Sequence, residues 1–366
     1  MPRIPSPRAG AASGEDKLIG IELLRFASAV AVLVFHYQHF AFVGTAQQHF
    51  VMTEQPFYPQ LSLFYNFGFY GVQVFWCISG FIFFWKYGQV ISQRRLTGYK
   101  FFILRLSRLY PLHFATLLFV ALVQMVYFAR NGAYFIYPNN DLYHFVLQLF
   151  MASNWGFQAG DSFNGPIWSI SIEVLVYCVF FLSLRYISGS TLAIVCMAIL
   201  PALVLFLKIS MHPVFSCMMF FYLGCLTAIA YTRAGGVPRY RVAANAAAVA
   251  AIATVIGLQF FVKVKPIYFL LIFSPALIFL CVSHIRATKL TSGLLVAAGS
   301  MTYSSYLLHV PIQLAAATLA TYLHWRIPIY SSVFFLSFLT GTLLLSFYCY
   351  KYFEIPAQNY LRRRFK

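Results

Sequence analysis

The chain of 366 residues is 61% hydrophobic and only 9% charged, with a formal net charge of +18 at pH 7. A soluble globular domain carries about a quarter charged residues, so this composition excludes a soluble fold. It indicates an all-α polytopic membrane protein, because helices satisfy their own backbone hydrogen bonds in lipid.

The N-terminal stretch 1–17 is rich in Pro, Gly, Ser and Ala, a composition typical of disorder, and we predict a disordered cytoplasmic tail there. The next stretch, 18–40, is apolar enough to span a bilayer. Because it is long and interrupted by Arg25, we do not expect it to be a cleaved signal peptide.

This first predicted helix carries four ionisable residues, Glu22, Arg25, His36 and His39. Arg25 and His36 are eleven positions apart, which is three turns plus ~20°, so both face one way about 16 Å apart along the axis. Ionisable groups at membrane depth are costly and are functional candidates by default. The alternative is that Glu22 pairs with Arg25 and that His36 only packs. His39 lies nearer the outer surface, and we interpret it as a bystander.

Ten apolar segments are long enough to span a hydrocarbon layer of about 30 Å. They cover 18–40, 66–87, 109–129, 167–187, 189–208, 213–232, 242–262, 266–286, 293–322 and 330–352. Most Lys and Arg fall in the loops on the side of the two termini, which by the positive-inside rule predicts N-in and C-in. Basic loops suit an anionic leaflet, so the charge needs no nucleic acid as partner. The weaker segment 142–155 is expected to be interfacial or re-entrant.

Between the second and third spans, "RLSRLYP" places Arg105 and Arg108 on one helical face at the membrane boundary. Arginine forks suit phosphates; the alternative is a positive-inside anchor. The fourth span begins with "NGPIWSISIEVLVY", which contains Trp168 and, one to two turns further, Glu173. Trp168 is compatible with an aromatic belt, whereas a lone carboxylate at that depth requires a partner or a function.

Near the C-terminus, "YSSYLLHVPI" places His309 in mid-helix before Pro311, and "YFEIPAQNYLRRR" contains Glu354 and a basic tail. We expect Glu354 to pair with a nearby arginine. The seven cysteines lie in or beside apolar segments without ligand spacing, so we expect neither disulfides nor a metal.

Taken together, these stretches resemble the acyltransferase-3 family of integral membrane acyltransferases. "LRFASAVAVLVFHY" resembles the first-helix motif of the family, an Arg and a His separated by ten residues, here Arg25 and His36. "GVQVFWCISGF", "RLSRLYP", "WSISIEVLVY", "YSSYLLHVPI" and "FEIP" resemble further motifs in the same order. Gln73 stands where the family often has an acidic residue.

The resemblance implies a transmembrane acyltransferase domain over 18–356 and a basic cytoplasmic tail over 357–366. It implies a protein of the bacterial inner membrane, surrounded by lipid, that moves an acetyl group from cytosolic acetyl-CoA to a sugar hydroxyl. The acceptor would be an exopolysaccharide, O-antigen or lipo-oligosaccharide, lipid-linked or at the surface.

The residues support a division of labour within that reaction. Arg25, Arg105 and Arg108 would bind the phosphates of the donor. His36 would act as general base, or as the carrier of an acetyl-histidine intermediate. Glu173 would orient His36 or hold the acceptor. The remaining acceptor-binding candidates are Trp168, Ser171 and His309.

Three alternatives stay open at the level of the sequence. A secondary transporter would also place an Arg/His/Glu relay in the membrane. A scaffold or sensor would tolerate changes at Arg25 and His36. Within the enzyme class, the acyl group could be succinyl or longer, and the acceptor a small molecule such as a macrolide.

Overall fold

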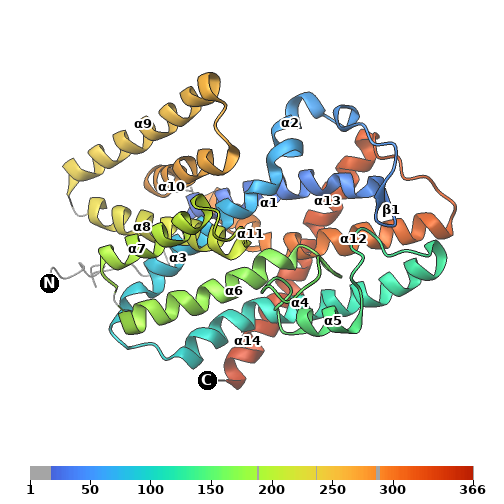
Figure 1. Ribbon diagram of the computed structural model, residues 1–366, viewed down its shortest axis with the longest axis horizontal. Helices are drawn as coiled ribbons and strands as arrows, with labels where there is room; N and C mark the ends of the chain where they lie inside the picture. The colour runs from blue at the N-terminus through green and yellow to red at the C-terminus, as the bar shows by residue number, and fades with distance from the viewer. Residues whose placement is uncertain (1–17, 188, 236, 286–288, 366) are drawn as a thin grey trace.

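The computed structural model describes residues 18–365 except 188, 236 and 286–288 (Figure 1). The predicted disordered tail, 1–17, lies outside the described residues. The longer helices are α1 (Ile19–His36), α3 (Gly71–Ser92), α4 (Gly98–Asn131), α6 (Ile167–Leu182), α7 (Thr191–Phe206), α8 (Pro213–Gly235), α9 (Pro238–Val262), α10 (Pro266–His284), α12 (Thr302–Tyr322) and α13 (Ser332–Cys349).

Shorter elements connect and extend these helices. They are η1 (Tyr37–Ala41), β1 (Phe42–Val43), β2 (Ala46–Gln47), η2 (Met52–Glu54), α2 (Tyr58–Phe67), η3 (Gly68–Tyr70), α5 (Leu142–Leu149), η4 (Ser183–Ile187), α11 (Lys289–Ser300), η5 (Tyr350–Glu354) and α14 (Ile355–Arg364). The two strands form one antiparallel pair in which Phe42 faces Gln47.

The all-α membrane fold predicted from the sequence is confirmed. Eight described helical segments are long and apolar enough to cross a membrane. The other two predicted spans correspond to α7, which is apolar but shorter, and to α12, whose buried face carries polar side chains. The segment 142–155 forms the short helix α5 and a loop, as its length and polarity indicate.

Helix α3 packs so closely against α8 that their backbones touch. A Cβ atom at Gly80 would lie 1.7 Å from the Phe221 carbonyl oxygen, and one at Gly224 would lie 1.9 Å from the Cys77 carbonyl oxygen. Both positions therefore require glycine, because any side chain would force the helices apart. This contact belongs to the main core, which also includes Trp76, Phe83 and Tyr177.

Helix α9 contrasts with this core. It lies at the periphery of the molecule in Figure 1, and only Ala248 and Val255 of its residues are buried. The helices with long buried faces are instead α1, α3, α8 and α12. The ionisable residues singled out in the sequence lie on α1 and α12 among these inner helices, on α4 and α6, and in η1 and η5.

Candidate active site

A cavity lined by three arginines lies between α1, α3, α4, α6 and α12. Its empty volume is about 880 Å³, within the range of small-molecule sites. We call it the arginine cavity. Its lining includes Arg25, Val72, Trp76, Ser79, Phe83, Arg105, Arg108, Ser169, Glu173, Tyr177, Tyr303 and Tyr306. The structure thus brings together the three predicted donor-binding arginines.

Each arginine is held differently. Arg25 forms an ion pair with Glu22, with 3.1 Å between nitrogen and oxygen, so the predicted pairing occurs while Arg25 also lines the cavity. Arg105 donates to the Tyr87 hydroxyl over 2.6 Å, and its guanidinium lies 4.7 Å from the centre of the Phe83 ring. The Nε atom of Arg105 is buried without a hydrogen-bond partner, which leaves a donor for a ligand.

A second cavity adjoins the first and shares Arg25, Ile82, Arg105 and Arg108 with it. Its empty volume is about 1180 Å³, and its charged lining adds Lys86, Arg362, Glu22 and Glu354. Arg362 donates to the Ser107 hydroxyl over 3.3 Å. The predicted basic tail is therefore partly helix α14, which brings one of its arginines to the cavity.

Glu173 lies in the arginine cavity. Ser79 and Tyr177 are beside its carboxyl group, which also interacts electrostatically with Arg108 and Arg25. The prediction that Glu173 orients His36 has no contact to support it among the described residues. Glu354 accepts a hydrogen bond from Ser304, and the described residues show no ion pair between Glu354 and an arginine.

Three imidazole rings meet where α1 passes into η1, and we call them the histidine cluster. The centre of the His36 ring lies 4.9 Å from that of His309 and 4.8 Å from that of His39. The interpretation of His39 as a bystander in the reaction stays a prediction, although η1 places its ring beside that of His36.

Tyr306 lies between the two regions. It lines the arginine cavity, and its ring centre is 6.0 Å from that of His309. Its hydroxyl shares a hydrogen bond of 2.7 Å with the Ser169 hydroxyl and donates to the Pro166 carbonyl oxygen over 2.9 Å. Tyr306 and Ser169 thus form the wall that separates the arginine cavity from the histidine cluster.

The other two predicted acceptor residues are differently placed. Trp168 stacks on Phe69 with 5.9 Å between ring centres and meets Trp76 edge-on, so it packs inside the protein rather than in an aromatic belt. Ser171 is fully buried, and its hydroxyl accepts from the Asn154 backbone N–H over 3.0 Å. Ser171 therefore anchors the loop that precedes α6.

Sequence reasoning missed Gln313, which bonds to two parts of the site. Its amide donates to the His36 carbonyl oxygen over 2.8 Å, and its Oε1 atom lies 3.2 Å from His39 Nδ1. Gln313 follows His309 by four positions, so both face the same side of α12. That spacing was the available signal.

The arrangement places a cavity lined by arginines near a group of imidazole rings within one set of helices, with Tyr306 between them. Arginines at one end can hold phosphates, and a neutral imidazole at the other can accept a proton.

Comparison with known proteins agrees with this arrangement. A family model described as an acyltransferase domain matches residues 18–351. No curated protein and no solved structure matches the chain with significance.

Proposed function

This chain belongs to the acyltransferase-3 family of membrane acyltransferases, and from that premise we propose that it transfers an acetyl group from cytosolic acetyl-CoA to a sugar hydroxyl. The acceptor would be an exopolysaccharide, O-antigen or lipo-oligosaccharide, modified at the bacterial inner membrane. The observation that carries the proposal is that α1 contributes Arg25 to the arginine cavity and His36 to the histidine cluster. Tyr306 lines that cavity and neighbours the cluster.

The donor would enter through the cavity that contains Arg362 and Lys86. Its phosphates would be bound by Arg105, Arg108 and Arg25, since guanidinium groups form strong paired hydrogen bonds with phosphate oxygens. The unpartnered Nε atom of Arg105 supports this role. The pantetheine arm would then extend past Trp76 toward the wall.

Chemistry would take place at His36. Its Nδ1 atom lies 3.0 Å from the Val32 carbonyl oxygen, which only accepts, so in the neutral ring Nδ1 carries the proton and Nε2 is the base. In direct transfer, Nε2 takes the acceptor's hydroxyl proton while the oxygen attacks the thioester carbonyl. The ester C–O bond forms, the C–S bond breaks, and the CoA thiolate receives the proton.

The alternative chemistry uses His36 as acyl carrier. Nε2 would attack the thioester carbonyl, the C–S bond would break and CoA would leave as the thiolate. The acceptor hydroxyl would then attack the resulting acetylimidazolium, whose C–N bond breaks as the ester C–O bond forms, and its proton would pass through a base to the thiolate. That second step needs another base, because His36 is acylated. His309, 4.9 Å away between ring centres, is positioned to supply it.

Purified protein in lipid vesicles tests the proposal. The probes are radiolabelled acetyl-CoA and the cells' own surface glycan, freed of esters by mild alkali. We expect label in the glycan with the wild type, none with His36→Ala, and wild-type labelling with His284→Ala, a control at an exposed histidine. Normal labelling by His36→Ala would remove His36 from the reaction. Proton-coupled uptake without any acetylation would favour the transporter.

A further inference from the structure

The histidine cluster offers hydrogen-bond acceptors and few donors. His309 Nδ1 lies 3.3 Å from the Ser305 carbonyl oxygen, so in the neutral ring Nδ1 carries the proton, as it does in His36. Gln313 fixes the third ring: since its Nε2 donates to the His36 carbonyl oxygen, its Oε1 accepts from His39 Nδ1. All three rings therefore keep a lone pair on Nε2.

Each of these lone pairs can accept a hydrogen bond from a donor group of a ligand. The Nε2 atom of His309 is fully buried and has no hydrogen-bond partner, a costly arrangement unless a bound molecule supplies a proton donor. A metal ion is not the match, because no set of three His, Cys, Asp or Glu side chains in the described part of the chain has metal-binding geometry. Hydroxyl groups are donors of suitable size.

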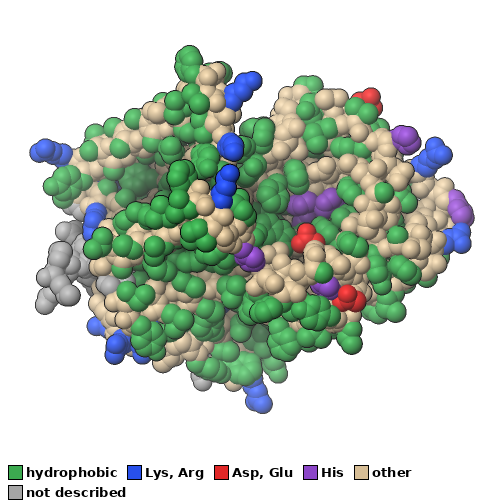
Figure 2. Space-filling view, in the orientation of Figure 1, with side chains coloured by type: hydrophobic (Ala, Val, Ile, Leu, Met, Phe, Trp, Pro, Cys, Tyr) green, Lys and Arg blue, Asp and Glu red, His purple; other side chains and the backbone are tan. Residues whose placement is uncertain are grey.

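A carboxylate lies beside the same region. Asp161 acts electrostatically on Tyr137 and Tyr306. The Tyr137 ring is 6.3 Å from that of His39, and the Tyr306 ring is 6.0 Å from that of His309. Asn139, which donates to the Asp161 backbone, is two residues from Tyr137, so the loop of Asp161 adjoins the segment that contacts the histidine cluster. Figure 2 shows histidine and acidic side chains together in a hollow of the face in view.

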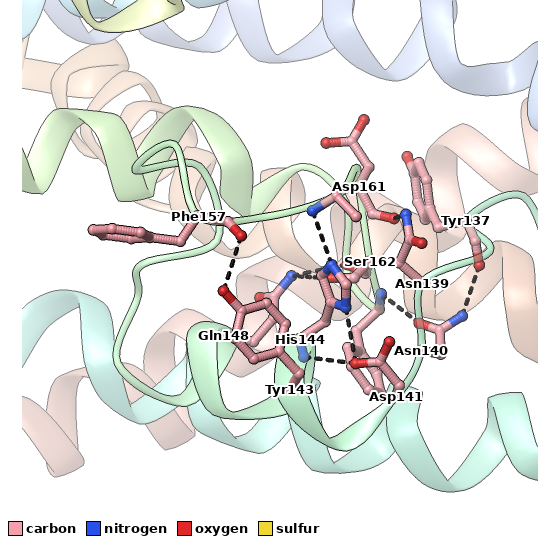
Figure 3. A network of polar contacts seen from close by, with 12 residues as sticks. Tyr137, Asn139, Asn140, Asp141, Tyr143, His144, Gln148, Phe157, Asp161 and Ser162 are labelled. Atoms are coloured by element: carbon pink, nitrogen blue, oxygen red, sulfur yellow. Dashed lines mark hydrogen bonds and ion pairs between the residues drawn. The ribbon is translucent and has the colours of Figure 1, made fainter.

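Asp161 is accessible although protein surrounds it. The residue is exposed, yet desolvation by the nearby protein raises the pKa of its carboxyl group, as expected for a group in a hollow. Only its backbone carbonyl oxygen takes part in the neighbouring network, accepting from Asn139 Nδ2 over 3.4 Å. Figure 3 shows its carboxyl group pointing away from that network.

The loop that carries Asp161 is tied down by its neighbours. Gln148 donates to the Ser162 carbonyl oxygen over 2.8 Å, and the Asn140 side chain accepts from the Phe163 N–H over 2.6 Å (Figure 3). His144 bonds to Asp141 over 2.8 Å and accepts from the Ala159 N–H over 3.2 Å. These contacts hold the backbone of the loop in place and leave the Asp161 carboxyl group available.

We propose that His39, His309 and Asp161 form the acceptor subsite, and that it takes a neutral sugar with free neighbouring hydroxyls. One hydroxyl donates to His36 and is acylated, and its neighbours donate to His39, His309 and the Asp161 carboxylate. An acidic sugar is disfavoured, because its carboxylate would face Asp161. The inference rests on the proposed function and adds His39, Asp161 and the charge class of the acceptor.

The test uses the vesicle assay with the de-esterified surface glycan separated by anion exchange into neutral and acidic fractions. We expect the wild type to label the neutral fraction preferentially. Asp161→Asn should raise the acceptor KM about tenfold, leave the acetyl-CoA KM unchanged, and reduce the preference for the neutral fraction. Glu54→Gln, a change at a carboxylate in η2, is the matched control and should alter none of these.

The remaining outcomes distinguish a failure of the proposed function from a failure of the acceptor subsite. If the wild type labels no glycan at all, the proposed function fails, whatever Asp161 does. If the wild type labels glycan and Asp161→Asn keeps the wild-type acceptor KM and preference, the acceptor subsite is overturned. An equal rise in acceptor KM with Asp141→Asn also overturns it, because the effect would then come from the loop and not from the carboxylate of Asp161.

Discussion

The arginine cavity and the histidine cluster each include a residue of α1, Arg25 and His36 respectively. Their polar side chains are stabilised inside the helical bundle in different ways. In the arginine cavity, charges face other charges: Arg25 pairs with Glu22, and Glu173 interacts electrostatically with Arg108 and Arg25. In the histidine cluster, the rings bond to backbone carbonyl oxygens and to one amide. Charge binding and proton transfer are thereby separated.

This separation suits a reaction between a polyanionic donor and a hydroxyl acceptor. A cationic site at the reacting centre would hold the phosphates instead of the thioester, and it would disfavour the protonated imidazole that catalysis must form. Placing Arg25 about 16 Å along α1 from His36 keeps both functions. Mutations in the two regions should therefore change different kinetic constants.

The largest expected effect tests the histidine cluster. His36→Gln removes the base or acyl carrier and should lower kcat by roughly 10² to 10⁴, the usual contribution of a general base. Binding of acetyl-CoA, measured by calorimetry on purified protein, should remain at the wild-type level. A variant that also loses donor binding would show that the two regions act as one site and would break the comparison.

The next largest effect tests the arginine cavity. Arg25→Ala should raise the acetyl-CoA KM about tenfold to a hundredfold, because a hydrogen bond to a charged group contributes roughly 1.5–3 kcal/mol. Arg25→Lys should recover part of that loss, since it keeps the charge but not the fork. Steady-state kinetics at saturating acceptor measure both. A fall in kcat with an unchanged KM for acetyl-CoA would contradict this assignment.

A change at Glu173 should have a smaller effect that distinguishes two roles. The sequence suggested that Glu173 orients His36 or holds the acceptor, whereas the structure places it in the arginine cavity. Glu173→Gln removes a negative charge beside the arginines, an effect of at least about 1 kcal/mol, the value for two unit charges ~4 Å apart in bulk water. We therefore expect the acetyl-CoA KM to fall about threefold to fivefold. The same kinetic assay distinguishes the earlier hypothesis: if Glu173 orients His36, kcat falls and the KM for acetyl-CoA stays constant.

The sequence predicted the spans and much of the site because both depend on local spacing. Hydrophobic length located the ten helices, and the eleven-residue spacing predicted that Arg25 and His36 face inward together. What it did not predict depends on how distant helices are rotated against one another. The sequence indicated how deep Glu173 lies in its helix, but not that its side chain faces the arginine cavity. The contact of Ser169 with Tyr306 joins residues 137 positions apart.

Asp161 was not among the residues predicted to bind the acceptor, for a related reason. Asp161 lies in a loop without periodicity, so nothing local relates it to His39 or His309. The approach of the His39 ring to that of His36 depends on η1 (Tyr37–Ala41), which departs from α-helical rotation. Such residues become visible only when α1, α12 and the loop before α6 are packed together.

The smallest expected effect concerns pH, and two carboxylates on either side of α5, Asp141 and Asp161, make it specific. Burial raises the pKa of Asp161, whereas hydrogen bonds from His144 lower the pKa of Asp141. As pH falls, Asp161 should therefore gain its proton above the usual range of an aspartate, near 3.8, and the acceptor KM should rise there by a few-fold. Asp161→Asn should abolish that rise.

Stability should respond with the opposite sign at Asp161. Its raised pKa means that the folded loop binds the proton more tightly than the unfolded chain, so protonation of Asp161 stabilises the fold as acceptor affinity declines. Asp141 stabilises the loop only in its charged form, and this contribution is lost as pH falls below the usual range of an aspartate. Thermal unfolding and acceptor KM measured over the same pH series separate the two. An acceptor KM that rises only where the protein unfolds would assign the effect to Asp141 and the loop, whereas a rise at undiminished stability assigns it to the carboxylate that faces the histidine cluster.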